Sequence, residues 1–184
     1  MKNVEFKAEL RDPTLAAGIL RTLGARFTTR MRQTDTYYRV VHGRLKKRET
    51  QVIRPAGSPD EPVEVIYYQR EDALKPKISD FTIYTESEAA ARFGPDPLPV
   101  WVVVTKTRSL YMLGPTRIHL DEVEGLGAFV EFESMVSSSN PEQAARRHNE
   151  ELRAALAHVL GEPLAMSYSD LLAAELERAR AARD

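Results

Sequence analysis

Charged residues at every second position of several segments constrain the fold of this chain more than any other feature. Between Asn3 and Leu10, apolar residues alternate strictly with polar or charged ones. Residues two positions apart in a β-strand point to the same side, so Glu5 and Lys7 share one face. Four later groups also share a strand face, because their members are separated by even numbers of residues: Arg44, Lys46 and Arg48; Lys106 and Arg108; Arg117 and Asp121; and Glu131 and Glu133. The sequence therefore predicts several strands with one charged and one mostly apolar face.

These charged faces allow two interpretations. For a single strand, such a face is the ordinary solvated side of an antiparallel sheet. The acidic residues, however, gather on the first of these strands and the last two, and the basic residues gather on the strands between them. If the sheet closed into a barrel with helices on its apolar side, all the charged faces would point into one lumen. A lumen of only one sign would repel itself, so the mixture indicates a ligand bound between the two sets.

Alternation, β-branched residues and aromatic residues predict the remaining strands. The predicted strands cover residues 3–10, 25–32, 36–41, 44–52, 63–70, 81–85, 100–110, 117–123 and 128–136. Helices are expected from Asp12 to Gly24, over residues 86–93, from Asn140 to Gly161, and after a cap at Ser169. Eight or nine strands with few helices favour a mainly β fold of the α+β class. We expect a large antiparallel sheet that closes into a barrel, with helices packed on its outside.

Composition excludes several other functions. The 184 residues are 42% hydrophobic and 29% charged, which suits one soluble domain spanning residues 1–184. The net charge of −1 does not favour nucleic acid or an anionic membrane as a partner. There are no cysteines, which excludes disulfides, thiolate metal sites and cysteine nucleophiles. No apolar run approaches the ~20 residues of a membrane span, and the N-terminus lacks a signal pattern, so we expect a cytoplasmic protein.

A metal triphosphate is the ligand that best matches the mixed charges. Lysine and arginine side chains neutralise phosphoryl oxygens, and glutamates supply the hard oxygen ligands that Mg²⁺ or Mn²⁺ prefers. The candidates for the phosphates are Lys46, Arg48, Lys106 and Arg108, and the candidates for the metal are Glu5, Glu131 and Glu133.

Seven segments, in order along almost the whole chain, resemble the CYTH superfamily of triphosphate tunnel metalloenzymes, which contains class IV adenylate cyclases and thiamine triphosphatases. They are residues 4–7 (VEFK), 33–38 (QTDTYY), 43–49 (GRLKKRE), 66–70 (IYYQR), 106–108 (KTR), 118–133 (IHLDEVEGLGAFVEFE) and 167–172 (SYSDLL). The resemblance implies an eight-stranded antiparallel tunnel. A homodimer is an expectation from the same resemblance.

The resemblance also implies roles for individual residues. Those expected to grip the phosphates are Lys46, Arg48, Arg70, Lys106 and Arg108, with Arg117 as a further candidate; those expected around the metals are Glu5, Asp121, Glu131 and Glu133. Lys7, Glu5 and Arg117 are the catalytic candidates. The opening signature of the family is Glu-x-Glu-x-Lys, and its first glutamate is Asn3 here.

The sequence leaves three alternatives for the function. We expect a class IV adenylate cyclase, which converts ATP to cyclic AMP and pyrophosphate, because Asn3 would weaken a second metal site that activates water. The segments 67–72 and 168–172 also resemble the cyclase branch. An inorganic tripolyphosphatase or thiamine triphosphatase is the second alternative, and a non-catalytic nucleotide or polyphosphate binder is the third.

The histidines and paired tyrosines receive no role in the reaction. His42, His119, His148 and His158 lack the mutual spacing of a zinc site, so we expect them on the surface or on helix faces. The pairs at 37–38 and 67–68 are expected to pack across neighbouring strands rather than against a nucleobase.

Overall fold

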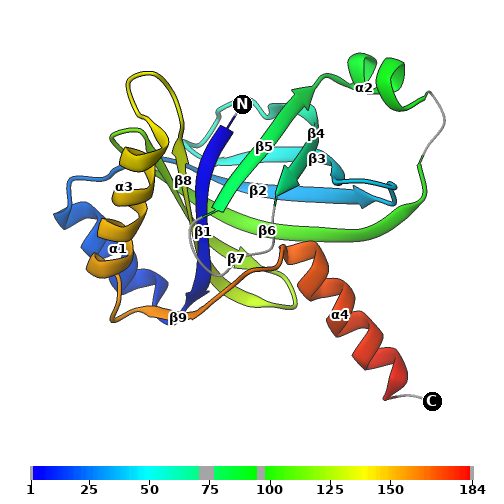
Figure 1. Ribbon diagram of the computed structural model, residues 1–184. Helices are drawn as coiled ribbons and strands as arrows, with labels where there is room; N and C mark the ends of the chain where they lie inside the picture. The colour runs from blue at the N-terminus through cyan, green and yellow to red at the C-terminus, as the bar shows by residue number, and fades with distance from the viewer. Residues whose placement is uncertain (1, 71–76, 95–97, 183–184) are drawn as a thin grey trace.

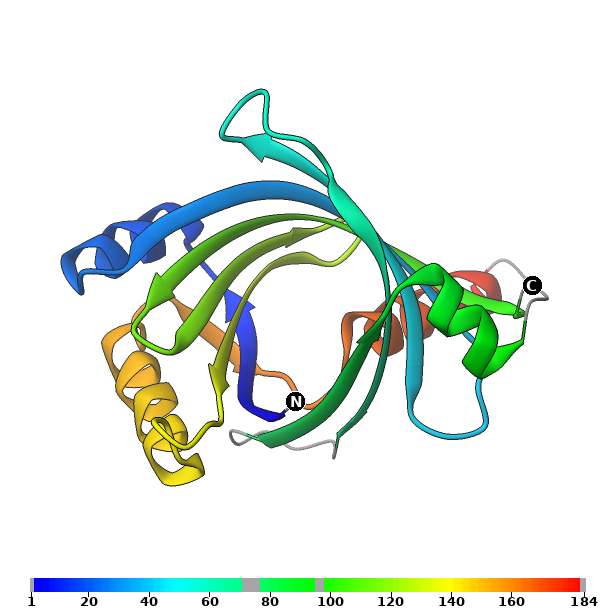
Figure 2. The same ribbon diagram turned by 90° about the horizontal axis from the view of Figure 1, so that it is seen from above.

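Eight antiparallel strands form a closed barrel in the computed structural model, which describes residues 2–70, 77–94 and 98–182 (Figures 1 and 2). The strands are β1 (Lys2–Leu10), β2 (Arg26–Tyr38), β3 (Arg44–Arg54), β4 (Glu61–Arg70), β5 (Lys77–Tyr84), β6 (Val100–Leu113), β7 (Thr116–Val123) and β8 (Gly127–Met135). Their order around the barrel is β5-β4-β3-β2-β6-β7-β8-β1. The predicted mainly β, closed eight-stranded architecture is confirmed.

The first strand closes the barrel with only part of its length. Residues Lys2 to Glu5 of β1 pair with β5, whereas Ala8 and Leu10 pair with a short additional strand, β9 (Leu160–Pro163). The opposite edge of β1 pairs with β8 from Asn3 to Glu9. β1 is therefore hydrogen-bonded along both edges. Its pairing with β8 fixes the register between the inward residues of these two strands.

The described residues also form four helices: α1 (Pro13–Thr22), α2 (Glu86–Phe93), α3 (Glu142–Ala155) and α4 (Tyr168–Ala181). In Figures 1 and 2, α1 and α3 lie outside the barrel. They cover the outer face of β1, β7 and β8, where Leu20, Leu156, Ile118 and Phe132 form the largest apolar core. A smaller core under α2 contains Leu45, Val65 and Ala89. No described helix combines the length and apolar character needed to cross a membrane.

Several predicted boundaries were wrong. A single strand, Arg26–Tyr38, replaces the two predicted within residues 25–41, because β2 pairs with β3 and β6 along most of its length. The third helix ends at Ala155, and Leu160 and Gly161, predicted to lie at its end, instead begin β9, which pairs with β1. The cap of α4 is Ser167, not Ser169, because Ser167 and Asp170 satisfy each other's backbone N–H groups in a capping box.

The beginning of α4 closes one end of the barrel. Tyr168 is buried and packs with Phe129 of β8 and with inward residues Val102 and Val104 of β6. Arg44 of β3 donates two hydrogen bonds to Asp170 and so ties the first turn of α4 to the barrel wall. The rest of α4 extends away from the barrel (Figure 1). The lumen is therefore apolar at the α4 end and charged farther in.

A buried asparagine joins α3 to the two strands that carry the predicted carboxylates. Asn149 accepts a hydrogen bond from the Ser134 hydroxyl at 2.9 Å and donates one to the Val4 carbonyl, also at 2.9 Å. Its side chain has no solvent exposure. Val4 and Ser134 are neighbours of Glu5 and Glu133, respectively, so this contact fixes the backbone from which both glutamates project.

Replacing Asn149 by alanine leaves two buried polar groups without this partner. We expect Asn149→Ala to lower the free energy of unfolding by about 2–4 kcal/mol, measured by urea denaturation. Glu151→Ala, on the same helix with a side chain 65% exposed, is the control and should change stability by less than about 0.5 kcal/mol. A loss of stability no larger in Asn149→Ala than in the control would contradict this account.

Candidate functional site

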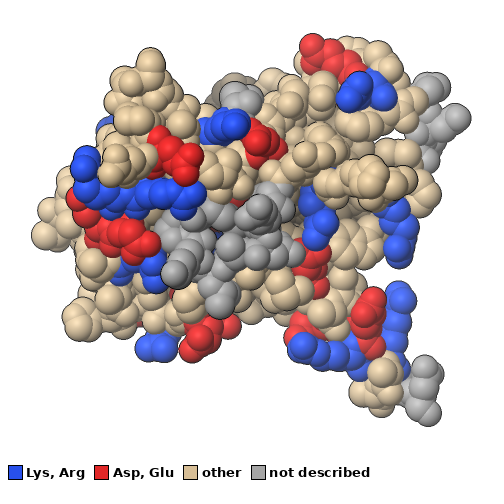
Figure 3. Space-filling view, viewed as in Figure 1, with Lys and Arg blue, Asp and Glu red and all other residues tan. Residues whose placement is uncertain are grey.

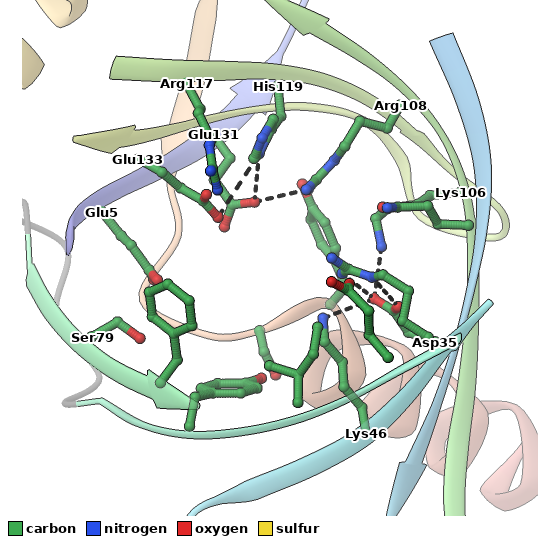
Figure 4. Close-up of a pocket in the computed structure, with 18 of the residues that line it drawn as sticks. Glu5, Asp35, Lys46, Ser79, Lys106, Arg108, Arg117, His119, Glu131 and Glu133 are labelled. Atoms are coloured by element: carbon green, nitrogen blue, oxygen red, sulfur yellow. Dashed lines mark hydrogen bonds and ion pairs between the residues drawn. The ribbon is translucent and has the colours of Figure 1, made fainter. Parts of the chain in front are cut away.

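The interior of the barrel contains a cavity of about 540 Å³ that is lined by charged side chains from seven strands. Its charged lining residues are Glu5, Lys7, Asp35, Lys46, Arg48, Glu61, Glu64, Lys106, Arg108, Arg117, Glu131 and Glu133. Apart from Glu61 and Glu64, those that share a strand are two positions apart, which is why a single closed sheet directs them inward. Figure 4 shows Glu5, Glu131 and Glu133 on one side of the lumen, together with Arg117, and Lys46 and Lys106 on the other side, together with Asp35.

Strand register arranges the acidic side in two rows. Glu5, Glu133 and Arg117 are aligned across β1, β8 and β7. One step farther along the same strands, Lys7, Glu131 and His119 are aligned. Because directly opposed side chains in an antiparallel sheet lie within contact distance, the register alone brings these six groups together.

Glu131 is the centre of the second row. Its Oε1 lies 3.0 Å from the Lys7 ammonium, and its Oε2 accepts a hydrogen bond of 2.9 Å from Arg108. Burial would raise the pKa of Glu131, but Lys7, His119 and Arg108 outweigh burial and hold this pKa well below its usual range. Glu131 is thus a carboxylate anchored between two cations at the tunnel wall.

His119 lies in the interior, so the expectation of a surface or helix-face position was wrong. It is 4% exposed, and its Nδ1 lies 3.4 Å from Glu131 Oε2 and 3.9 Å from Glu133 Oε1. His119, Glu131 and Glu133 each offer one ligand atom, and these atoms all lie within 4.8 Å of one another. A signal was present in the sequence, because His119 shares a strand face with Arg117 and Asp121.

Asp121 lies behind Arg108 rather than on the cavity surface. Its two oxygens accept hydrogen bonds from Arg108 Nε and Nη2 at 2.7 and 2.6 Å, and the Tyr168 hydroxyl donates a third at 2.9 Å. Burial would raise the pKa of Asp121, but Arg108 outweighs it and the pKa is lowered. This geometry makes Asp121 the group that orients Arg108, and its prediction as a metal ligand stays a prediction.

The basic side of the lumen is organised around one carboxylate. Asp35, on β2, accepts hydrogen bonds from Lys46 and Lys106 at 2.9 and 2.7 Å, and from Arg48 at 2.7 and 2.8 Å. Asp35 is 1% exposed; burial would raise its pKa, but Arg48, Lys106 and Lys46 hold that pKa well below its usual range. One carboxylate cannot neutralise three cations, so the cluster retains positive charge that can bind an anion.

Burial and neighbouring positive charges disfavour the protonated form of Lys106. Its side chain is 1% exposed, and its pKa is lowered to about 7, first by burial and then by the neighbouring charges of Arg48, Arg108 and Lys46, against the opposing effect of Asp35. An anion placed between these cations would favour the protonated ammonium. The cluster is therefore electrostatically incomplete without a negatively charged partner.

The donor groups on the acidic side fit a hard divalent cation. Glu5 and Glu133 offer carboxylate oxygens, His119 offers a ring nitrogen, and Asn3 Oδ1 is a buried oxygen for which no hydrogen-bond partner is found among the described residues. Asn3, which replaces the expected first glutamate, lines the cavity and is 2% exposed. An uncompensated buried carbonyl oxygen is costly unless something satisfies it, and a cation is one such partner.

The wall formed by β4 and β5 contributes apolar and aromatic side chains in addition to Glu61, Glu64 and Ser79. Ile66 and Tyr68 from β4 and Phe81 and Ile83 from β5 line the cavity there. Tyr37 and Tyr68 also lie within about 6 Å of the Lys46 ammonium, measured to the ring centroids at 5.4 and 6.0 Å. The cavity thus combines two charged clusters with one apolar, partly aromatic wall.

Most predicted site residues meet in this cavity. Lys7, Glu5, Arg117, Lys46, Arg48, Lys106, Arg108, Glu131 and Glu133 line it, and Arg117 is exposed at the row of Glu5 and Glu133. The side chain of Arg70, the last residue of β4, lies outside the described part of the structure. Sequence reasoning missed Asp35, His119 and Tyr168. Asp35 shares a strand face with Tyr37 and could have been found by alternation, whereas Tyr168 enters from a helix.

Comparisons with known proteins agree with this architecture. The family model described as CYTH domain matches residues 1–158. The structure of the PH1819 protein from Pyrococcus horikoshii is similar, with a TM-score of 0.70 and 23% identity over 94% of this chain and 99% of that chain. A putative adenylate cyclase from Vibrio parahaemolyticus has a TM-score of 0.65 and 21% identity over 92% and 97%.

A more distant structure has the same fold. The Hippeastrum protein HpAC1, described as a putative adenylyl cyclase that reveals a dominant triphosphatase activity, has a TM-score of 0.51 and 14% identity over 85% of this chain and 87% of that chain. None of the curated proteins matches this chain. Because the family model spans well over half of the residues, the chain belongs to the CYTH domain family.

Proposed function

We propose that this protein binds a triphosphate together with Mg²⁺ or Mn²⁺ inside the barrel and converts ATP to cyclic AMP and pyrophosphate. The observation that carries the proposal is the placement of an incompletely neutralised cation cluster across one cavity from a cluster of carboxylates. A metal triphosphate needs both clusters at once, since its oxygens are anionic and its metal requires hard ligands. The names of structural neighbours, which include adenylate cyclase, support the same class of substrate.

The charged residues would divide the work of holding the substrate. Lys46, Arg48 and Lys106 would neutralise phosphoryl oxygens on one side of the triphosphate. Arg108, which is held by Asp121 and Glu131, would contact the triphosphate from its other side. Lys7 and Arg117, beside the carboxylates, are placed to stabilise charge that develops on the reacting phosphate. Arg70 remains a predicted phosphate ligand.

The carboxylate side would hold the metal. Glu5 and Glu133 would bind Mg²⁺ or Mn²⁺, while Glu131 is already shared between Lys7 and Arg108. When bound, the metal would neutralise substrate oxygens and lower the pKa of the attacking hydroxyl. The Asn3 amide would add a neutral oxygen where a glutamate would add charge, which favours a cyclase over an enzyme that must also activate water.

The apolar wall supports an organic triphosphate. Inorganic tripolyphosphate has no apolar group that would contact Ile66, Tyr68, Phe81 or Ile83, whereas a nucleobase offers a flat surface that packs against such residues. This wall lies within the same cavity as both charged clusters, so one nucleotide could contact all three regions.

A triphosphatase is the second candidate. The cation cluster around Asp35 is suited to any triphosphate, because it contains no group that selects a base. The name of the Hippeastrum neighbour, which has the same fold, attributes a dominant triphosphatase activity to that protein. Inorganic tripolyphosphate and thiamine triphosphate are therefore the alternative substrates, and binding without turnover is the third outcome.

Incubation with Mn-ATP tests the three alternatives. We expect cyclic AMP and pyrophosphate in equal amounts, measured by chromatography and a pyrophosphate assay. Glu133→Gln should lower the rate by roughly 100-fold, because it removes a charged metal ligand. The control Glu122→Gln changes an exposed glutamate of β7 that pairs with Arg30, and it should retain full activity.

Other products would assign a different function. Orthophosphate released from ATP, or faster turnover of tripolyphosphate or thiamine triphosphate, would replace the cyclase by a triphosphatase. Tight triphosphate binding without turnover under Mg²⁺ or Mn²⁺ would identify a binding protein.

The cation cluster should become a tighter anion site when its carboxylate is removed. Asp35→Asn leaves three buried cations without their counter-ion, so we expect the free energy of unfolding to fall by about 3–5 kcal/mol in phosphate-free buffer. Tripolyphosphate with EDTA should raise the melting temperature of Asp35→Asn more than that of the wild type. Asp80→Asn, 58% exposed on β5, is the control. Equal stabilisation of wild type and Asp35→Asn would argue against phosphate binding at this cluster.

Triphosphate binding near pH 8 should take up protons. Lys106, with a pKa of about 7, is mostly neutral at this pH, and an adjacent anion raises that pKa and favours protonation. Calorimetry of tripolyphosphate binding with EDTA, in two buffers that differ in ionisation enthalpy, should show uptake of a fraction of a proton that disappears in Lys106→Met. Lys47→Met, which changes a lysine outside the cavity, should retain it. Equal uptake in Lys106→Met would contradict the assignment.

The partner expected from these features is a small triphosphate molecule. On the face drawn in Figure 3, lysines and arginines are interspersed with acidic residues. The absence of a nucleic acid partner stays a prediction. The cytoplasmic location and the homodimer remain predictions.

A further inference from the structure

His119 has an unusual position for a histidine without an assigned role. It projects from the middle of β7 into the cavity, and the residues aligned with it are Glu131 on β8 and Leu110 on β6. Figure 4 shows its ring directed toward the carboxylates of Glu131 and Glu133. The same ring atom, Nδ1, faces both of them, at 3.4 and 3.9 Å. One nitrogen and two carboxylates therefore converge on a single space.

The distances are longer than those of good hydrogen bonds. N–H···O bonds in proteins cluster near 2.9–3.0 Å. Two donor atoms bound to one divalent cation at about 2.1 Å lie roughly 3 Å apart at right angles and roughly 4 Å apart on opposite sides, a range that includes the separations of Nδ1 from both Glu131 and Glu133. The 3.4 Å contact lies at the long end of the hydrogen-bond range, and both separations are compatible with a cation shared between the three groups.

Neighbouring cations leave His119 and Glu133 as the freer members of this cluster. Lys7 binds one oxygen of Glu131 and Arg108 binds the other, at 3.0 and 2.9 Å. The side chain of Glu133 is 20% exposed, more than twice the 9% of Glu131. Because Lys7 and Arg108 contact the oxygens of Glu131, a cation held by the Glu133 carboxylate and the His119 nitrogen would displace neither of them.

We propose that His119 binds the divalent metal through Nδ1, together with Glu133, and that this nitrogen ligand makes the site prefer Mn²⁺ over Mg²⁺. The inference rests on the metal site of the proposed function and adds a ligand that sequence reasoning did not assign. Imidazole suits transition metals, whereas Mg²⁺ favours oxygen ligands, so one histidine among carboxylates shifts the preference.

Pulsed electron paramagnetic resonance of Mn²⁺ bound to the intact protein tests this without substrate. Wild-type protein should show coupling to a directly bound nitrogen, and labelling histidine with ¹⁵N should change the coupling to that isotope. His119→Asn should abolish it. His158→Asn, an exposed histidine, is the matched control and should retain it.

Metal affinities provide a second measurement. His119→Asn should weaken Mn²⁺ binding by at least ~10-fold and alter Mg²⁺ binding by less than about 3-fold. An asparagine amide can still donate a hydrogen bond to Glu131, so a role limited to orienting the carboxylate would leave both affinities nearly unchanged. Absence of nitrogen coupling in the wild type, or its persistence in His119→Asn, would overturn the proposal.

These results are separable from the reaction itself. Mn²⁺ bound through His119 in a protein that converts no triphosphate would support the ligand and refute the proposed function. Cyclic AMP formation by a protein without nitrogen coupling would do the reverse.

Discussion

The rest of this structure depends on burying opposed charges inside a closed sheet. Lys106 and Asp35 are almost completely inaccessible, and removing either charge from water is expensive unless the other compensates for it. Asp35 compensates for three cations only in part, and Arg108 is shared between Asp121 and Glu131. The lumen therefore fixes the positions of its charges, but their desolvation is only partly compensated within the protein. An anionic ligand and its metal would supply the remaining compensation, which favours their binding.

Stability has to come from outside the barrel, because its centre is polar. The largest apolar core lies between the outer faces of β1, β7 and β8 and the helices α1 and α3, with Leu20 and Phe132 among its members. Alternation along each strand serves both layers at once, since every second residue faces the helices and the others face the cavity. Asn149 links these layers by joining α3 to β1 and β8.

Several residues outside the proposed substrate-binding set orient the side chains within that set. Asp121 orients Arg108, and Tyr168 holds Asp121 through its hydroxyl while its ring lies 3.9 Å from the Lys7 ammonium. The end of the barrel closed by α4 is thereby connected to the carboxylate cluster, because Arg108 and Lys7 both contact Glu131. Arg44 and Asp170 add a partly exposed ion pair to this closure.

The sequence by itself determined which residues face the lumen, because strand alternation is a local property with a period of two. That was enough to predict the closed barrel and to bring Glu5, Lys46, Lys106 and Glu133 toward one channel. Only the tertiary structure decided the register that aligns His119 with Glu131, the pairing of β9 with β1, and the entry of Tyr168. These three features depend on contacts between residues that are far apart in the sequence. The local residue pattern of either contacting segment does not show which distant segment it will contact.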